Sequence, residues 1–183
     1  MRYQRTVTLK NGTSCIIRNG TAQDAQAVLT NFVSTHGQTD FLTTYPEECT
    51  FTVEAEEAYL NKQTESARDV ELVADIGGVI AGTAGVDSIR NAEKTRHRAG
   101  FGISIDKDWW GLGIGRALTE SAIECARAAG YLQLELEVVA ANTRAYSLYQ
   151  SVGFVEYGRN PKGFRSRLTG WQELVLMRLE LNR

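Results

Sequence analysis

The chain has 183 residues, 20 Lys and Arg against 22 Asp and Glu, and three Cys. This length suits one domain with a single core, and we expect residues 1–183 to form one. A net charge of −2 gives no broad cationic surface, so we expect neither nucleic acid nor a membrane as partner. Residues 1–20 lack a secretion signal, and the uncharged stretch 76–86 is too short to span a bilayer, which predicts a cytoplasmic protein. The scattered Cys residues and two isolated His residues predict reduced thiols and no metal.

The first hundred residues alternate between strand-like and helical patterns, and no linker or repeat divides them. The T-x-x-D sequence at 21–24 predicts the start of a helix, and Thr52 can cap a second one that runs to about Glu65. Gly77 and Gly78 join two β-rich segments and tolerate the positive φ angles of a tight hairpin, so these segments should pair antiparallel. The segment 36–50 predicts a loop. Strands are predicted at 14–18, 70–75, 79–89 and 101–105.

A glycine-rich stretch, Gly111 to Gly115, follows the last of these strands and opens a helix that ends at Gly130. Glycines let backbone amides point into such a turn, and the unpaired N–H groups of a helix start suit a pyrophosphate. Arg116 adds a positive charge there. The glycines alone leave three interpretations open: a structural turn without a ligand, a dinucleotide site and a coenzyme A site. The dinucleotide pattern G-x-G-x-x-G is not matched, because Arg116 stands three residues after Gly113.

A strand and a short helix follow in the next segment. Residues 132–139 alternate apolar and polar side chains, which predicts a strand with one apolar face. Asn142 can cap a helix whose apolar side includes Tyr149 and which ends at Gly153.

Two motifs, W-G-L-G-I-G-R-A-L at 110–118 and N-T-R-A-Y-S-L-Y-Q-S-V-G-F at 142–154, together resemble the GNAT superfamily of N-acetyltransferases. The resemblance implies a single-domain α/β GNAT-like fold: a mixed, mostly antiparallel central sheet flanked by helices, with a splayed strand pair for acyl-CoA. It implies acetyl-CoA as the donor and a primary amine of a small molecule or peptide as the acceptor. The implied cofactor contacts are the backbone of Ile103 and Ile105 for the pantetheine arm, the amides of Gly111, Leu112, Gly113, Ile114, Gly115 and Arg116 for the pyrophosphate, Asn142 for the pantetheine, and Tyr149 near the sulfur. The polar residue that begins the family motif is Trp110 here, so the backbone amides and Arg116 must suffice.

Acetyl transfer to an amine requires a base and an acid. An alkylammonium with a pKa of roughly 10 must lose a proton before it attacks, and the departing thiolate must gain one. By the family pattern Tyr149 is the general acid, although a tyrosine at this spacing also fits simple packing. We assign the base to Glu137 as a hypothesis. The alternatives are Glu135, the pair Glu47–Glu48 or a water chain. His36 and His97 are expected at the surface, and Asn142 can serve as a plain helix cap.

The C-terminal segment predicts a loop over 162–171 and then a strand over 173–181. Aromatic and basic residues alternate in the loop, which fits a hairpin that lines the acceptor cleft or forms a homodimer edge better than RNA binding, given the net charge. A second function class stays open for the whole chain: a non-catalytic acyl-CoA-binding regulatory module with the same fold.

Overall fold

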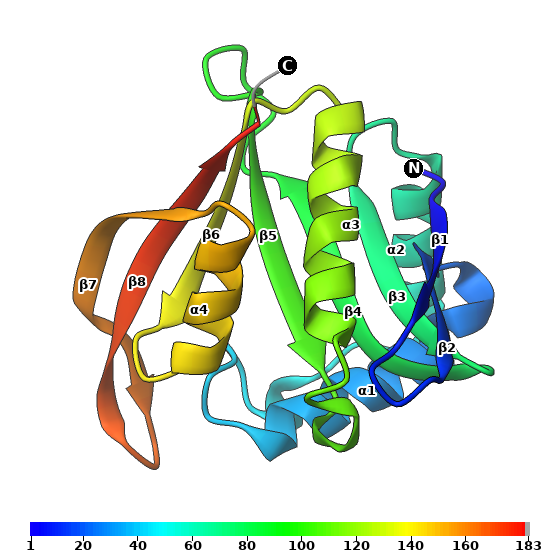
Figure 1. The fold of residues 1–183 in the computed structure, drawn as a ribbon, viewed down its shortest axis with the longest axis horizontal. Helices are drawn as coiled ribbons and strands as arrows, with labels where there is room; N and C mark the ends of the chain where they lie inside the picture. Colours follow the sequence, from blue (N-terminus) through cyan, green and yellow to red (C-terminus); the bar gives the residue numbers. More distant parts are fainter. Residues whose placement is uncertain (182–183) are drawn as a thin grey trace.

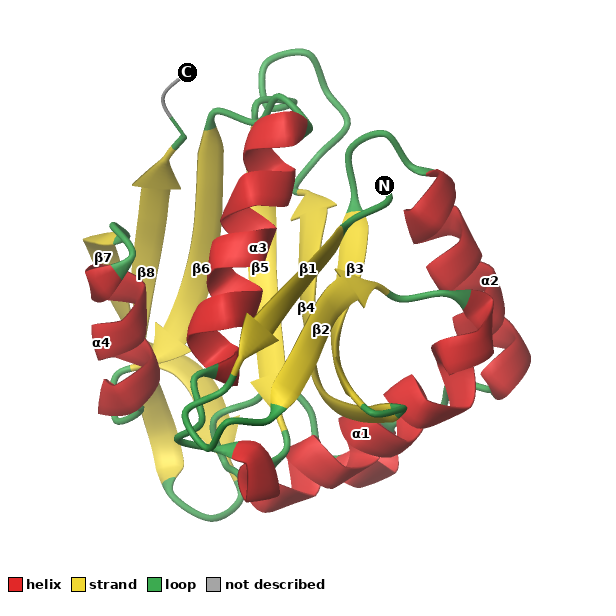
Figure 2. Ribbon diagram, turned by 45° about the vertical axis from the view of Figure 1, so that its right-hand side comes forward, coloured by secondary structure: helices red, strands yellow, loops and turns green. Residues whose placement is uncertain are grey.

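The computed structural model describes residues 1–181 and contains one eight-stranded sheet, in the order β1-β2-β3-β4-β5-β6-β8-β7. Helices α3 and α4 lie on one face of the sheet, and α1 and α2 lie on the other (Figures 1 and 2). The strands are β1 (Gln4–Thr8), β2 (Ser14–Asn19), β3 (Val70–Ile76), β4 (Val79–Ser88), β5 (Arg98–Ile105), β6 (Gln133–Val139), β7 (Val155–Ser166) and β8 (Gly170–Glu180). The helices are α1 (Ala25–Gln38), α2 (Val53–Glu65), α3 (Ile114–Ala128) and α4 (Thr143–Ser151), with short 3₁₀ turns η1 (Ala22–Asp24), η2 (Pro46–Glu48) and η3 (Lys107–Trp109).

Strands β5 and β6 form the one parallel pair of this sheet, as described over residues 1–181; the other neighbouring strands are antiparallel. The two strands pair only over Arg98–Gly100 and then diverge (Figure 1). From Phe101 onward, the edge of β5 that faces β6 therefore has no strand beside it. This is the splayed pair that the resemblance implies, and it confirms the predicted mixed, mostly antiparallel architecture.

Each face of the sheet carries its own apolar core. On the α3 face, Ile114, Leu118, Ala122 and Ala126 recur at helical spacing and are buried against the strands. A smaller core lies under α1 and α2 and comprises Ala25, Val28, Leu60, Val73 and Ile80. Fewer buried apolar side chains pack between the sheet and helices α1 and α2 than on the α3 face, and a cavity lies on the α1 and α2 side.

Several predicted local features are confirmed. The Asp24 carboxylate accepts a hydrogen bond from the Thr21 amide at 2.8 Å, and the Thr52 hydroxyl accepts one from the Ala55 amide at 3.2 Å. The β3–β4 hairpin turns through Gly77 and Gly78, both with positive φ. Within residues 1–181, no helix combines the length and apolar character needed to cross a bilayer.

One strand was missed, and two boundaries were predicted wrongly. Strand β1 was missed, because its alternation is weak and it pairs with β2 only at the sheet edge. Helix α1 continues to Gln38, so the segment from residue 36 is not yet loop. Strand β7 extends to Ser166 through part of the predicted loop, because pairing with β8 overrides the low strand propensity of residues such as Pro161 and Gly163.

Candidate active site

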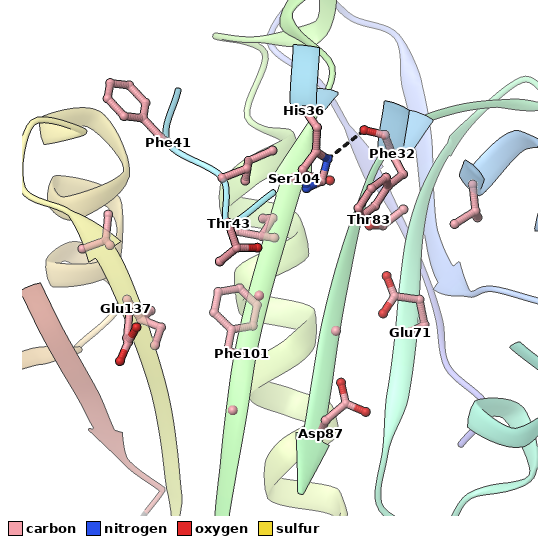
Figure 3. A pocket seen from close by; sticks show the side chains of 18 of the residues that line it. Phe32, His36, Phe41, Thr43, Glu71, Thr83, Asp87, Phe101, Ser104 and Glu137 are labelled. Atoms are coloured by element: carbon pink, nitrogen blue, oxygen red, sulfur yellow. Dashed lines mark hydrogen bonds between the residues drawn. The ribbon is translucent and has the colours of Figure 1, made fainter. Parts of the chain in front are cut away.

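A cavity of about 910 Å³ lies on the α1 and α2 side of the sheet, beside the point where β5 and β6 diverge. Strands β3 to β6 form its floor, and α1, α2 and the loop around residues 41–43 enclose it (Figure 3). Four of the predicted site residues line this cavity: Ile103, Glu137, Asn142 and Tyr149. Ile105 and residues 111–116 lie outside its lining, at and beyond the end of β5.

Tyr149 is both a packed residue and a lining residue of the cavity. Its ring is buried and packs against the rings of Phe101 and Phe154, whose centroids lie 6.1 and 5.9 Å away. No residue in the described chain hydrogen-bonds to its hydroxyl. Burial raises the pKa of Tyr149 above that of an ordinary phenol. The hydroxyl is therefore a proton donor, not a phenolate, at neutral pH.

The four acidic candidates for the base occupy different environments. Glu137 lines the cavity (Figure 3). Glu135 instead pairs with Arg98, whose Nη2 lies 2.7 Å from its Oε2. Glu47 forms an exposed ion pair with Arg167, and Glu48 accepts a hydrogen bond from the Tyr45 amide at 2.7 Å. Of these four carboxylates, only that of Glu137 lines the cavity that Tyr149 also lines.

Asn142 caps α4 as its residue type predicts. Its Oδ1 accepts a hydrogen bond from the Ala145 amide at 3.2 Å, and the same residue lines the cavity. Within residues 1–181 its side-chain Nδ2 makes no hydrogen bond. Capping uses the oxygen and leaves the amide nitrogen free to donate to a ligand carbonyl.

The glycine turn presents a row of backbone donors. Gly113 is the N-cap of α3 and has a φ of +101°, a conformation that favours glycine. Within the described chain, the amides of residues 111–116 donate no backbone hydrogen bond. A Cβ on Gly115 would lie 3.2 Å from Ile105 Cδ1 and 3.3 Å from Leu148 Cδ2, so glycine allows the helix start to approach β5 and α4 closely. These features fit a polyphosphate, which needs converging N–H donors and close backbone approach.

The cation beside this turn is Arg144, which sequence reasoning did not single out. Its Cζ lies 5.4 Å from the centroid of the Trp110 ring, and its Nη2 lies 3.9 Å from where a Gly111 Cβ would stand. The Arg116 side chain instead bonds to Ser151 at 2.8 Å and pairs with Glu120. Arg116 lies in the first turn of α3, and its expected contribution of positive charge to the turn stays a prediction.

Trp110 has a structural role that accounts for the departure from the family motif. Its indole Nε1 donates a hydrogen bond to the Ile105 carbonyl oxygen at 2.8 Å. The ring thus fixes the end of β5 against the turn and also supports the Arg144 guanidinium.

Three polar cavity residues were missed or misplaced by sequence reasoning. His36 is buried, stacks on Phe32 at 3.8 Å and lines the cavity, so its predicted surface position is wrong. Burial lowers its pKa, which favours a neutral ring. Glu71 and Asp87 line the cavity from β3 and β4 (Figure 3). An acidic residue inside an otherwise apolar strand, as at Glu71, is the signal that was available.

The C-terminal hairpin closes one end of the cavity. Phe164 of β7 is a lining residue, and Asp40, next to the lining residue Phe41, is held by this hairpin. The Asp40 carboxylate accepts hydrogen bonds from Ser166, Thr169 and Gln172 at 2.7 to 2.9 Å. The loop that covers the cavity is therefore tied to β7 and β8.

The model of the acetyltransferase (GNAT) family matches residues 38–154, more than half of the chain. The chain belongs to the GNAT acetyltransferase family. A GNAT acetyltransferase structure from Streptococcus pneumoniae superimposes with a TM-score of 0.87 at 31% identity, covering 91% of this chain and 99% of that one. The structure of yncA from Salmonella typhimurium with its cofactor acetyl-CoA shares the GNAT fold, with a TM-score of 0.80 at 21% identity over 91% of this chain and 94% of that one.

Curated relatives of this GNAT chain are named as N-acyl- and N-acetyltransferases. An L-amino acid N-acyltransferase from Escherichia coli is 29% identical over 61% of this chain and 64% of its own length. The ribosomal protein bS18 alanine N-acetyltransferase from Escherichia coli is 34% identical over 45% of this chain and 55% of its own length. The chain thus spans less than two thirds of the length of either relative.

Proposed function

We propose that this GNAT chain, acting as one N-acetyltransferase domain over residues 1–183 in the cytoplasm, transfers an acetyl group from acetyl-CoA to a primary amine. The observation that carries the proposal is the common cavity of Tyr149, Glu137 and Asn142 beside the divergence of β5 and β6. The family membership and the acetyl-CoA bound to a structural relative support it.

The residues present fit acetyl-CoA as the donor substrate. The unpaired amides of residues 111–116 and the Arg144 guanidinium would hold the pyrophosphate. The Ile103 backbone and the Ile105 amide, on the edge of β5 that has no strand beside it, would hold the pantetheine arm together with the Asn142 side chain. When bound, the donor supplies a thioester whose acyl carbon accepts the amine.

The proposed proton transfers use two residues of the cavity. Glu137 takes a proton from the substrate ammonium, so that the neutral nitrogen forms the new N–C bond as the C–S bond breaks. Tyr149 donates its phenolic proton to the leaving sulfur. The nitrogen releases two protons in all: one leaves through Glu137 to solvent, and the second replaces the proton that Tyr149 gave up.

The test is release of thiol from acetyl-CoA with a panel of polyamines, amino acids, aminoglycosides and peptides. At least one amine should release CoA in proportion to acetylated product. Acetyl-CoA binding without release by any acceptor would overturn the enzymatic proposal and favour the non-catalytic acyl-CoA-binding module.

A further inference from the structure

The cavity has a second acidic region, away from Glu137. Glu71 of β3, Asp87 of β4 and Glu56 of α2 line its side beneath α2, and Figure 3 shows the first two across β5 from Glu137. Glu71 Oε2 and Asp87 Oδ2 lie 2.8 and 3.3 Å from the position that a Cβ would take on Gly85. The two carboxylates therefore converge on the same space above a residue that has no side chain.

These carboxylates form no salt bridge in the described chain, and the positive charge of Lys62 on α2 acts on Asp87 only at longer range. Within residues 1–181, the cavity lining includes no Lys or Arg, and none of the three acids forms a salt bridge. Gln63 donates one hydrogen bond to Asp87 Oδ1 at 2.8 Å. Burial, together with the charges of Asp87 and Glu56, raises the pKa of Glu71 to about 8, against polar contacts with the Thr83 and Tyr59 hydroxyls that lower it. Glu71 and Glu56 are half-buried and Asp87 is exposed. A cationic ligand beside them would favour the ionised form of these acids over the protonated one.

An open floor connects this region to the reaction centre. Glu71 pairs in register with Gly85, and Gly85 pairs with Gly102 of β5. No atom lies within 4 Å of a Cβ position on Gly102. Two strand spacings separate Glu71 from Gly102, roughly 10 Å. Glu137 lies on β6, beyond Gly102 and across the gap where β5 and β6 diverge. An extended aliphatic chain along this floor would therefore run from the Glu71 region toward Glu137.

We propose that Glu71, Asp87 and Glu56 bind a second ammonium group of the acceptor, so that the acceptor is an aliphatic diamine or polyamine. The inference rests on the proposed acetyl transfer, with the reacting amine beside Glu137. An amine with a pKa of roughly 10 is cationic at neutral pH and complements the acids. An amino acid would bring its carboxylate into a cavity whose described lining has four acids and no Lys or Arg.

The test compares substrates that differ by one amine. The kcat/KM of putrescine and of spermidine should exceed that of n-butylamine by about tenfold or more, because one added ion pair in a partly enclosed site has this magnitude. Glu71→Gln and Asp87→Asn should each lower the putrescine to n-butylamine ratio by about tenfold. Glu57→Gln is the matched control, because Glu57 is an exposed residue of α2 outside the cavity lining, and it should leave the ratio unchanged.

A binding measurement separates this inference from the proposed reaction. Calorimetry of spermidine with the CoA-saturated protein should give a Kd that rises about tenfold in Glu71→Gln, and the unchanged acetyl-CoA Kd of each variant checks its fold. If no amine releases CoA, the proposed acetyl transfer is rejected. Calorimetry of spermidine then still tests whether Glu71, Asp87 and Glu56 bind an ammonium group. Equal kcat/KM for putrescine and n-butylamine, preference for an amino acid, or a ratio unchanged in both variants would overturn the diamine site and leave the reaction standing.

Discussion

The Tyr149 ring meets the Phe101 ring edge to face, with centroids 6.1 Å apart and planes at 89°. This contact depends on the aromatic ring and not on the hydroxyl, so packing and proton donation by Tyr149 can be separated by experiment.

Tyr149→Phe should lower kcat by about 100-fold, because it removes the proton donor while retaining the ring. The acetyl-CoA Kd should stay within about twofold, since the aromatic contacts remain. Steady-state thiol release and calorimetry measure the two quantities. Tyr146→Phe on the same helix is the control, because the Tyr146 hydroxyl bonds to Glu156 outside the cavity. Wild-type turnover in Tyr149→Phe would reject the acid role.

Glu137→Gln should lower kcat/KM by about 100-fold near neutral pH, where the acceptor amine needs a base. The deficit should shrink as pH approaches roughly 10, because the free amine then loses its proton in solution. A pH profile of both proteins measures this. Glu135→Gln should keep kcat/KM within about twofold, because Glu135 is engaged by Arg98. A deficit independent of pH would contradict the base assignment.

Gly113→Ala should weaken acetyl-CoA binding by about tenfold, because the new Cβ disfavours the φ of +101° that aims the amides of the turn. It should also lower the free energy of unfolding by about 1 kcal/mol. Gly130→Ala tests strain alone: Gly130 has a φ of +78°, and no atom lies within 4 Å of its Cβ position. It should lose similar stability and keep the wild-type acetyl-CoA Kd. An equal loss of acetyl-CoA affinity in both variants would reject the proposal that the amides of the glycine turn bind the pyrophosphate.

Asp40→Ala should raise the acceptor KM several-fold without changing the acetyl-CoA KM, because it frees the loop over the cavity from β7 and β8. The loss of three hydrogen bonds to a carboxylate should lower the free energy of unfolding by about 2 kcal/mol. Ser166→Ala removes one donor and should show a smaller change of both quantities. Kinetics with each substrate varied in turn and thermal unfolding provide the measurements. A rise in both KM values would point to general destabilisation instead.

Glu71→Gln should stabilise the ligand-free protein at alkaline pH. The pKa of Glu71 is raised to about 8 by burial and by Asp87 and Glu56, so the folded state holds a proton that the unfolded state has lost above its ordinary pKa of 4.5. Wild-type stability should therefore fall as pH rises from about 4.5 to 8, whereas the variant lacks this carboxyl. The difference should be near zero below pH 4.5 and should approach about 5 kcal/mol above pH 8, because each pH unit between the two pKa values contributes roughly 1.4 kcal/mol. Denaturant unfolding across this range measures it, and a constant difference would contradict the raised pKa.

The segment 110–154 could be predicted closely from the sequence. The glycine turn, α3, β6 and the Asn142 cap each depend on neighbouring residues, through left-handed glycine angles, helical spacing, alternation and capping chemistry. Local rules of this kind predict elements and their order without knowledge of the fold. The role of Tyr149 as the acid came instead from the family resemblance, and Glu137 was one of several candidate bases.

Only the tertiary structure decided which other groups reach the cavity. Register between β3 and β4 sets Glu71 and Asp87 above Gly85, and the end of α1 places His36 in the lining of the same cavity. In the same way, the fold directs the Arg116 side chain to Ser151 and brings Arg144 to the turn. A residue's own sequence neighbours determine its backbone geometry and the face it occupies. Whether that face meets solvent, a core or an enclosed cavity depends on strands and helices far along the chain, whose pairing no local pattern encodes.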